Sequence, residues 1–392
     1  MRTKILKFDK IYCSPGKTIR GASIVVEDGN IKSIGDASEN NAEVVDLTDY
    51  TAFPGLIDVH THLTFGPTRG GGGRSPVVNM VLGQQSAKQT LEVGVTTVRD
   101  LNSTEFLDVA MRDLVNMGAL IGPRMFVAGY GLKITGGKQG AGRPPTGGFA
   151  DGPNEVMKVV RQQVAAGVDW IKIFGSTGGM DDHSDLQTFT FEEINAATKA
   201  AHNLGKPVAF HTYCASAAAD AVKAGVDSIE HSIDLEKDTI EEMTRKKIFY
   251  VPTIDHNRYY SEHCEELGFS KDSRSNFESA IDRLLKTTKK AHLAGVPIAM
   301  GSDANFTMFG ENTRELEWFI KSGMSVDETI ATATTNGAAL LRKDNVLGKI
   351  APGFFADIIA VEGDQTSDIK HLVNNVKWVM KQGNVLVDRT KI

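Results

Sequence analysis

An alternation of short apolar runs with helical stretches constrains the fold of this 392-residue chain more than any other feature. Between Pro54 and Arg342, eight runs have the length and composition of buried strands, and helical patterning separates each run from the next. Such alternation is typical of parallel sheets, and eight units predict a closed (β/α)8 barrel, the TIM-barrel fold. The runs are LIDVHTH, VTTVRD, MFVAGY, WIKIFG, PVAFHTY, SIEHS, IFYVPTI and IAMGSD.

Glycines and capping residues mark the ends of the helical segments. Several glycines close a helical stretch directly before a strand, as expected for the left-handed residue that follows a helix. These are Gly94, Gly167, Gly225 and Gly295. Two helix starts have the S/T-x-x-E spacing of a capping box, at residues 190–193 and 325–328. An open, doubly wound sheet is the alternative, but the chain lacks the glycine-rich dinucleotide fingerprint of that fold.

The two ends of the chain are patterned differently from the middle. Both contain short runs of alternating apolar and polar residues, and Asp28-Gly29 and Gln382-Gly383 are turn signals within them. Either end alone would expose too much strand edge, so we expect both to meet in one small β-sandwich domain. The predicted organisation is a discontinuous β domain, 1–54 and 345–392, with the barrel, 55–344, inserted into it.

Composition excludes several classes of protein. The 43 basic and 49 acidic residues leave a net charge of −6, which argues against a nucleic-acid or membrane surface. No run of about 18 apolar residues occurs, and charges interrupt the first residues where a signal peptide needs an apolar core. The three cysteines form neither a disulfide framework nor a CxxC zinc motif. We therefore expect a soluble cytoplasmic protein.

Six residues with metal-ligand chemistry converge on the carboxyl ends of the predicted strands, where barrels place their active sites. A His-x-His pair on one strand points both rings to the same face. A buried unpaired lysine is costly, so a lysine between two isoleucines should be neutralised or chemically altered. Each residue alone has an ordinary interpretation, such as a strand histidine or a helix-capping aspartate, but their coincidence predicts a metal site. The six are His60, His62, Lys172, His211, His231 and Asp303.

The motifs GLIDVHTHL, DWIKIF, VAFHTY, SIEHS and MGSDAN resemble those of the amidohydrolase superfamily. The resemblance is to its imidazolonepropionase-like and prolidase-like branch, which includes Xaa-Pro dipeptidases and zinc carboxypeptidases, and it covers nearly the whole chain. It implies two divalent metal ions, which in that family are usually zinc. His60, His62 and Asp303 would hold one ion and His211 and His231 the other. Lys172, as an N-carboxylated carbamate, would bridge the two.

This arrangement implies hydrolysis of a C–N bond. Two metals that share a water lower its pKa, and Asp303 would act as general base and then as general acid towards the leaving nitrogen. Dipeptides, N-acyl amino acids and related aryl amides or carbamates are the expected substrates. Cyclic-amide hydrolysis, deamination, and lactone or phosphotriester hydrolysis remain alternatives on the same scaffold, although the bridging lysine weighs against a deaminase. A non-catalytic scaffold is only a remote alternative, because none of the metal ligands expected from the family pattern is missing from this sequence.

Three further residues are candidate substrate contacts. Tyr213 lies two residues beyond His211 on the same face of its strand, unless it is a simple rim aromatic. Lys138 stands in ITGGKQG where relatives commonly have a histidine, and Phe309 is a second departure from the family pattern. His256 follows the seventh strand and reaches the site unless it is an exposed loop residue. The remaining histidines, His183 among them, have no position that points to the site. Because relatives are often oligomers, the resemblance also implies a possible homo-oligomer.

Overall fold

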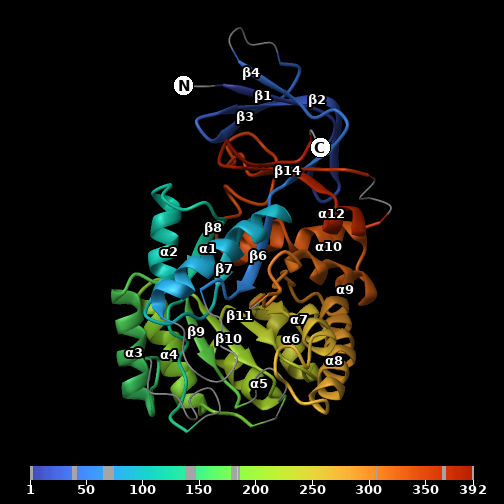
Figure 1. Cartoon of the computed structure of the whole chain (residues 1–392). Coiled ribbons are helices and arrows are strands. Elements are labelled where there is room, and N and C mark those ends of the chain that lie inside the picture. The colour runs from blue at the N-terminus through green and yellow to red at the C-terminus, as the bar shows by residue number, and fades with distance from the viewer. Residues whose placement is uncertain are drawn as a thin grey trace.

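The computed structural model describes residues 3–37, 42–64, 75–136, 147–177, 183, 186–305, 307–363 and 368–390. A β domain built from both ends of the chain lies at one end of the molecule, and a barrel of strands and helices forms the rest (Figure 1). No helix in these ranges is both long enough and apolar enough to span a membrane.

The β domain is one eight-stranded sheet that joins the two chain ends. Its order is β15-β14-β13-β5-β1-β2-β3, with β4 paired to β1. The ends meet where β5 pairs parallel with β1 and antiparallel with β13. Its strands are β1 (Lys4–Ser14), β2 (Lys17–Glu27), β3 (Asn30–Gly35), β4 (Glu43–Asp46), β5 (Thr51–Pro54), β13 (Ile358–Val361), β14 (Val376–Lys381) and β15 (Asn384–Asp388).

Both predicted hairpin turns are confirmed. Asp28 and Gly29 between β2 and β3, and Gln382 and Gly383 between β14 and β15, all have positive φ angles, as a two-residue hairpin turn requires. The turns come from opposite ends of the chain but touch, because a Cβ on Gly383 would lie 3.0 Å from the Cα of Gly29. The expected domain built from both chain ends is therefore present, whereas its boundaries at 54/55 and 344/345 stay a prediction.

Seven named parallel strands form most of the barrel wall. They fall into one sheet of three strands and one of four, and backbone hydrogen bonds join the two sheets beside β8. At that joint Leu132 donates to the carbonyl of Lys172, and Phe174 donates to that of Leu132. The strands are β6 (Leu56–Thr61), β7 (Val95–Asp100), β8 (Arg124–Val127), β9 (Ile171–Phe174), β10 (Val208–Thr212), β11 (Ser228–His231) and β12 (Phe249–Val251).

The eighth predicted run, IAMGSD, closes the barrel without forming a regular strand. On one side Ala299 donates to the carbonyl of Tyr250 in β12, at 3.1 Å. On the other side Val59 of β6 donates to the carbonyl of Met300, at 2.9 Å, and Asp303 donates to that of His60, at 2.8 Å. The positive φ of Asp303, 53°, ends the extended conformation at the carboxyl end of this run.

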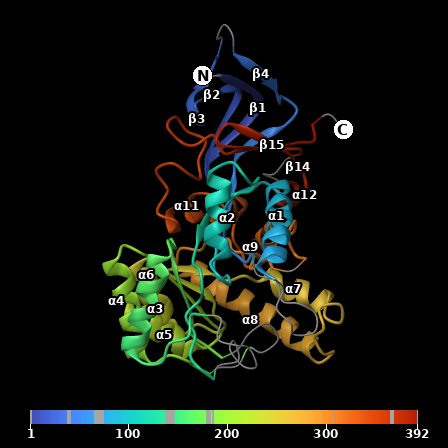
Figure 2. The ribbon, with the colours of Figure 1, turned by 60° about the vertical axis from the view of Figure 1, so that its left-hand side comes forward.

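Helices cover the outside of the barrel (Figure 2). The predicted capping boxes at Thr190 and Ser325 are both formed, and the four predicted helix-ending glycines all have positive φ. The helices are α1 (Pro76–Glu92), α2 (Leu107–Asn116), α3 (Pro153–Ala165), α4 (Phe191–Asn203), α5 (Ala215–Ala224), α6 (Lys237–Lys246), α7 (Asp255–Glu262), α8 (Ser273–Leu293), η1 (Asn312–Arg314), α9 (Glu315–Lys321), α10 (Val326–Thr332), α11 (Thr335–Leu340) and, near the β domain, α12 (Lys370–Asn374).

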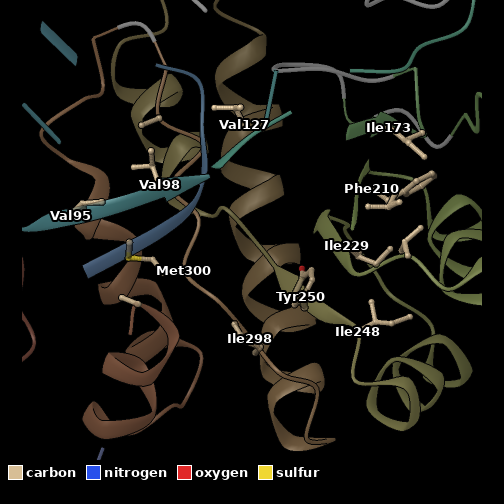
Figure 3. Close-up of a cluster of buried hydrophobic side chains, with 14 of the residues drawn as sticks. Val95, Val98, Val127, Ile173, Phe210, Ile229, Ile248, Tyr250, Ile298 and Met300 are labelled. Atoms are coloured by element: carbon tan, nitrogen blue, oxygen red, sulfur yellow. The ribbon is translucent and has the colours of Figure 1, made fainter. Parts of the chain in front are cut away.

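Alternation along each strand sorts its side chains between two layers. Outward residues such as Val98, Phe210 and Ile229 pack with the helices in the main hydrophobic cluster (Figure 3). The residues between them in sequence point into the barrel, and in β9 and β11 these include Lys172 and Glu230. The same periodicity that builds the core therefore directs the polar side chains to the barrel axis.

Candidate metal centre

The carboxylate of Asp303 lies at the centre of the predicted site. Its Oδ1 is 3.0 Å from Nε2 of His62 and 3.6 Å from Nε2 of His60. Its Oδ2 is 4.0 Å from Nδ1 of His231 and 3.8 Å from Nδ1 of His256. Two groups with the spacing to hold a metal ion share this carboxylate, one with His60 and His62 and the other with His231 and His256.

Lys172 lies beside the first of these groups. Its side chain is fully buried, and its Nζ is 3.2 Å from Nε2 of His60. Burial lowers the pKa of Lys172 to about 8, although the nearby charges of Glu230 and Asp303 oppose this lowering. Within the described ranges, no carboxylate forms an ion pair with this ammonium. The structure therefore places the predicted lysine in a buried position where, among the described residues, its ammonium has no direct ion pair.

His211 and Tyr213 continue the site on the β10 side. The ring centroid of His211 is 4.4 Å from that of His231, and Tyr213 stacks on His231 at 5.3 Å. His211 lies in β10 and Tyr213 directly follows the last residue of that strand, and their ring centroids are 5.2 Å apart. His256 is buried rather than exposed on a loop. Its Nδ1 lies 3.8 Å from Oδ2 of Asp303, which places it among the candidate metal ligands and not only among the candidate substrate contacts.

The backbone at this site is held in an uncommon conformation. Asp303 and His231 have φ angles of 53° and 67°, and Thr253, which contacts His231, has a φ of 51°. Residues other than glycine rarely adopt positive φ, and this conformation persists only where surrounding contacts enforce it. The strain marks the same residues that converge on the centre.

The protonation states fit metal binding. Burial lowers the pKa values of His60 and His231 well below the ordinary range, so both imidazoles are neutral. Burial alone would raise the pKa of Asp303, but the hydrogen bond with His62 and the nearby His256 and Lys172 lower it overall. Nε2 of His256 is buried and has no hydrogen-bond partner among the described residues. Neutral imidazoles around an ionised carboxylate are the donor set of a divalent ion such as zinc.

Glu230 is a functional candidate that the sequence reasoning did not select. Its Oε2 is 2.8 Å from Nδ1 of His60, and its Oε1 accepts from Arg99 at 2.8 Å. All three side chains are fully buried. Two features of the sequence could have indicated this role for Glu230. Glu230 lies inside the strand motif SIEHS, next to the predicted ligand His231, and a second charged residue, Arg99, lies inside the strand motif VTTVRD.

His183 was also missed. Its ring packs edge-on against Tyr213 at 4.7 Å and lies 6.4 Å from Phe277 of α8. No positional argument in the sequence points to His183, and the structure places its ring beside Tyr213. No local pattern in the sequence predicts this contact.

The two departures from the family pattern have different outcomes. Lys138 lies outside the described residues. Phe309, expected to make one side of the mouth more apolar, is 5% exposed and packs in the main hydrophobic cluster. Its contribution is thus to the core.

The fold and the site define a class: a barrel protein with a buried cluster of potential metal ligands at the carboxyl ends of its strands. The model of the amidohydrolase family matches residues 51–386, and the chain belongs to that family. The structure of a Xaa-Pro dipeptidase with methionine bound in its active site superposes with a TM-score of 0.90. It is 32% identical and covers 98% of this chain and 100% of its own.

Two relatives match in sequence over most of their length. The ochratoxinase of Aspergillus niger is 27% identical over 390 residues, which span 91% of this chain and 80% of that protein. The imidazolonepropionase of Clostridium tetani is 24% identical over 431 residues, spanning 95% and 92%. The family, together with the peptidase and amide-hydrolase relatives, indicates a hydrolase of C–N bonds.

Proposed function

We propose that this protein is a binuclear metal-dependent amidohydrolase that cleaves the amide bond of N-acyl amino acids or dipeptides. The observation that carries the proposal is Lys172, which is fully buried, 3.2 Å from a candidate ligand and without an ion-pair partner in the described structure. A lysine so placed fits a role as a modified, anionic ligand better than a role as a free ammonium.

The modification would be N-carboxylation. The neutral amine of Lys172 adds to carbon dioxide, an N–C bond forms, and one proton is released to solvent. The pKa of about 8 means that a fraction of the amine is neutral near pH 7. The resulting carbamate carries one negative charge shared by its two oxygens, which would suit a ligand between two cations. His60, His62 and Asp303 would hold one ion, and His211 and His231 the other, with His256 adjacent.

Divalent ions in such a site supply Lewis acidity, which lowers the pKa of water and polarises a carbonyl oxygen. The chain itself supplies the base. Because the pKa of Asp303 is lowered, its carboxylate is ionised and accepts the proton of the attacking water. The same residue then donates that proton to the leaving nitrogen. Burial of the surrounding side chains keeps bulk water from competing for these contacts.

The surroundings of Tyr213 support a substrate with an apolar or aromatic part. The rings of Tyr213, His183 and Phe277 contact one another in a row that begins next to the candidate metal ligands, and Phe277 at its far end is fully buried. The 32%-identical neighbour is a Xaa-Pro dipeptidase that holds an amino acid with an apolar side chain in its active site. We therefore propose an amino-acid product with such a side chain, and no nucleic-acid or membrane partner.

Metal analysis of matched lysine variants tests the proposal. Lys172→Met should reduce the metal content from about two equivalents and abolish turnover. Lys381→Met is the control, because burial also lowers the pKa of Lys381 to about 8, but this lysine contacts Gly122 far from the site. A wild-type stoichiometry of one ion that is indifferent to Lys172→Met would contradict the binuclear centre.

A substrate screen of the wild-type enzyme tests the reaction. Release of a free amino acid from N-acyl amino acids or dipeptides supports the proposal. Ammonia without a second organic product would indicate deamination. A single ring-opened product would indicate cyclic-amide hydrolysis, the activity suggested by the imidazolonepropionase relative.

A further inference from the structure

The interior of the barrel contains a buried ion pair that contacts one ligand of the proposed centre. We propose that Glu230, held in place by Arg99, is a positioning residue that fixes the orientation and tautomer of His60 for metal binding. This inference rests on the proposed metal centre but concerns residues outside its ligand set.

The contacts of Glu230 leave it no freedom. Its Oε2 meets Nδ1 of His60 at 2.8 Å, and its Oε1 accepts from Arg99 at 2.8 Å and from Ser228 at 2.5 Å. Because an ionised carboxylate only accepts hydrogen bonds, Nδ1 of His60 must carry the ring proton. The lone pair of His60 is then on Nε2, the atom that faces Asp303 and Lys172.

Arg99 is also held in place by several hydrogen bonds, one of which is to a residue of β6. Its Nε donates to the carbonyl of Val59 at 2.5 Å, and its other nitrogens donate to Ser228 and Glu230. Its guanidinium lies 4.3 Å above the ring of Trp170. An arginine with this full set of partners keeps its charge and gives Glu230 a charge-assisted hydrogen bond. The network thus ties β7 and β11 to the residue next to His60 in β6.

His231 provides a contrast within the same site. Its Nδ1 meets the hydroxyl of Thr253 at 2.6 Å rather than a carboxylate. A carboxylate partner raises the basicity of a ligating imidazole and fixes its ring, whereas a hydroxyl does so less strongly. Among the described residues, only one chain of contacts from an arginine through a carboxylate to a histidine is fully buried, and its histidine is His60.

A structural role alone does not account for this arrangement. Replacing a buried ion pair with apolar residues is often neutral for stability, whereas removing one partner leaves an uncompensated charge. The single and double variants therefore separate stability from ligand positioning.

The experiment measures zinc affinity of the purified full-length protein by competition with a chelator, alongside thermal unfolding of the metal-free form. Glu230→Gln should weaken zinc binding by about 10- to 100-fold, the range found for such outer partners. The double variant Glu230→Gln/Arg99→Met should recover stability relative to Glu230→Gln, because no unpaired charge remains. Its zinc affinity should stay low, because His60 still lacks its carboxylate.

Asp357→Asn is the matched control. It breaks an arginine–aspartate pair at the other end of the barrel, where Arg124 contacts Asp357 at 2.5 Å. This variant should lose stability and keep wild-type zinc affinity. Zinc affinity that follows stability in all variants, or wild-type affinity in Glu230→Gln, would overturn the inference. A wild-type protein that binds no zinc would instead overturn the metal centre itself, and the inference with it.

Discussion

Charged groups are buried at both ends of the barrel, but in different ways. At the amino end of β8, Arg124 pairs with Asp357, which also accepts from the backbone of Gln382. This pair joins the barrel to the β domain and has its partners within the chain. At the carboxyl ends of the strands, imidazoles and a buried lysine surround one carboxylate. The comparison indicates that the first end serves stability, whereas the second is arranged for a ligand that the chain does not supply.

The strongest test of this contrast is Asp303→Asn. The amide retains the shape of the side chain but cannot accept the proton of the attacking water, so we expect kcat to fall by about 1,000-fold. Metal content should remain nearly unchanged. Turnover by amino-acid release and metal content by elemental analysis provide the two measurements. If the variant keeps its turnover, Asp303 is not the base.

Gly301→Ala tests how closely the barrel packs around His60. A Cβ at position 301 would lie 2.7 Å from Cβ of His60 and 2.5 Å from Val251. We expect a loss of about 1–3 kcal/mol in unfolding free energy from overpacking, together with weaker zinc binding. Chemical denaturation and chelator competition measure these effects.

Gly122→Ala is the control for this overpacking, because it lies near the β domain and its nearest contacts would be 3.2 and 3.3 Å. Its zinc affinity should match that of the wild type. Unaltered zinc binding in Gly301→Ala would show that His60 tolerates displacement.

Asp357→Asn tests the other end of the barrel, where Asp357 pairs with Arg124, and we expect it to change stability alone. Arg124 would keep its charge without its carboxylate, so the unfolding free energy should fall by about 2 kcal/mol. Because the pair is far from the centre, kcat should be unaffected. A comparable loss of activity and stability would mean that the two ends of the barrel are coupled.

The smallest expected effect is a pH dependence from Lys381, whose Nζ donates to the carbonyl of Gly122 at 2.6 Å. Burial lowers its pKa to about 8, below the ordinary value of 10.5 in the unfolded chain. Between these values the unfolded chain binds more protons, so stability should rise as the pH increases from 8 to 10.5. Lys381→Met should remove this contribution, as measured by urea unfolding across the range. An identical slope in the variant would assign the dependence to other groups.

Much of the architecture followed from local patterns. The period-2 and helical patterning predicted the barrel, and the turn dipeptides predicted both hairpins, because these signals depend on neighbours in sequence. The approach of His60, His62, His231 and Asp303 also followed, since parallel strands bring their carboxyl ends to one face. The irregular closure of the barrel at residues 298–303 could not be predicted from local patterns, because it depends on hydrogen bonds with both flanking strands.

The sequence by itself therefore determined which residue types reach the mouth of the barrel. Strand alternation sends every second side chain inward, whatever that side chain is. Only the tertiary structure decided the partners: Glu230 with His60 and Arg99, His183 with Tyr213, and Phe309 with the core. The physical reason is that such contacts join residues from different strands and loops. Their distances depend on how the barrel closes, which no local pattern encodes.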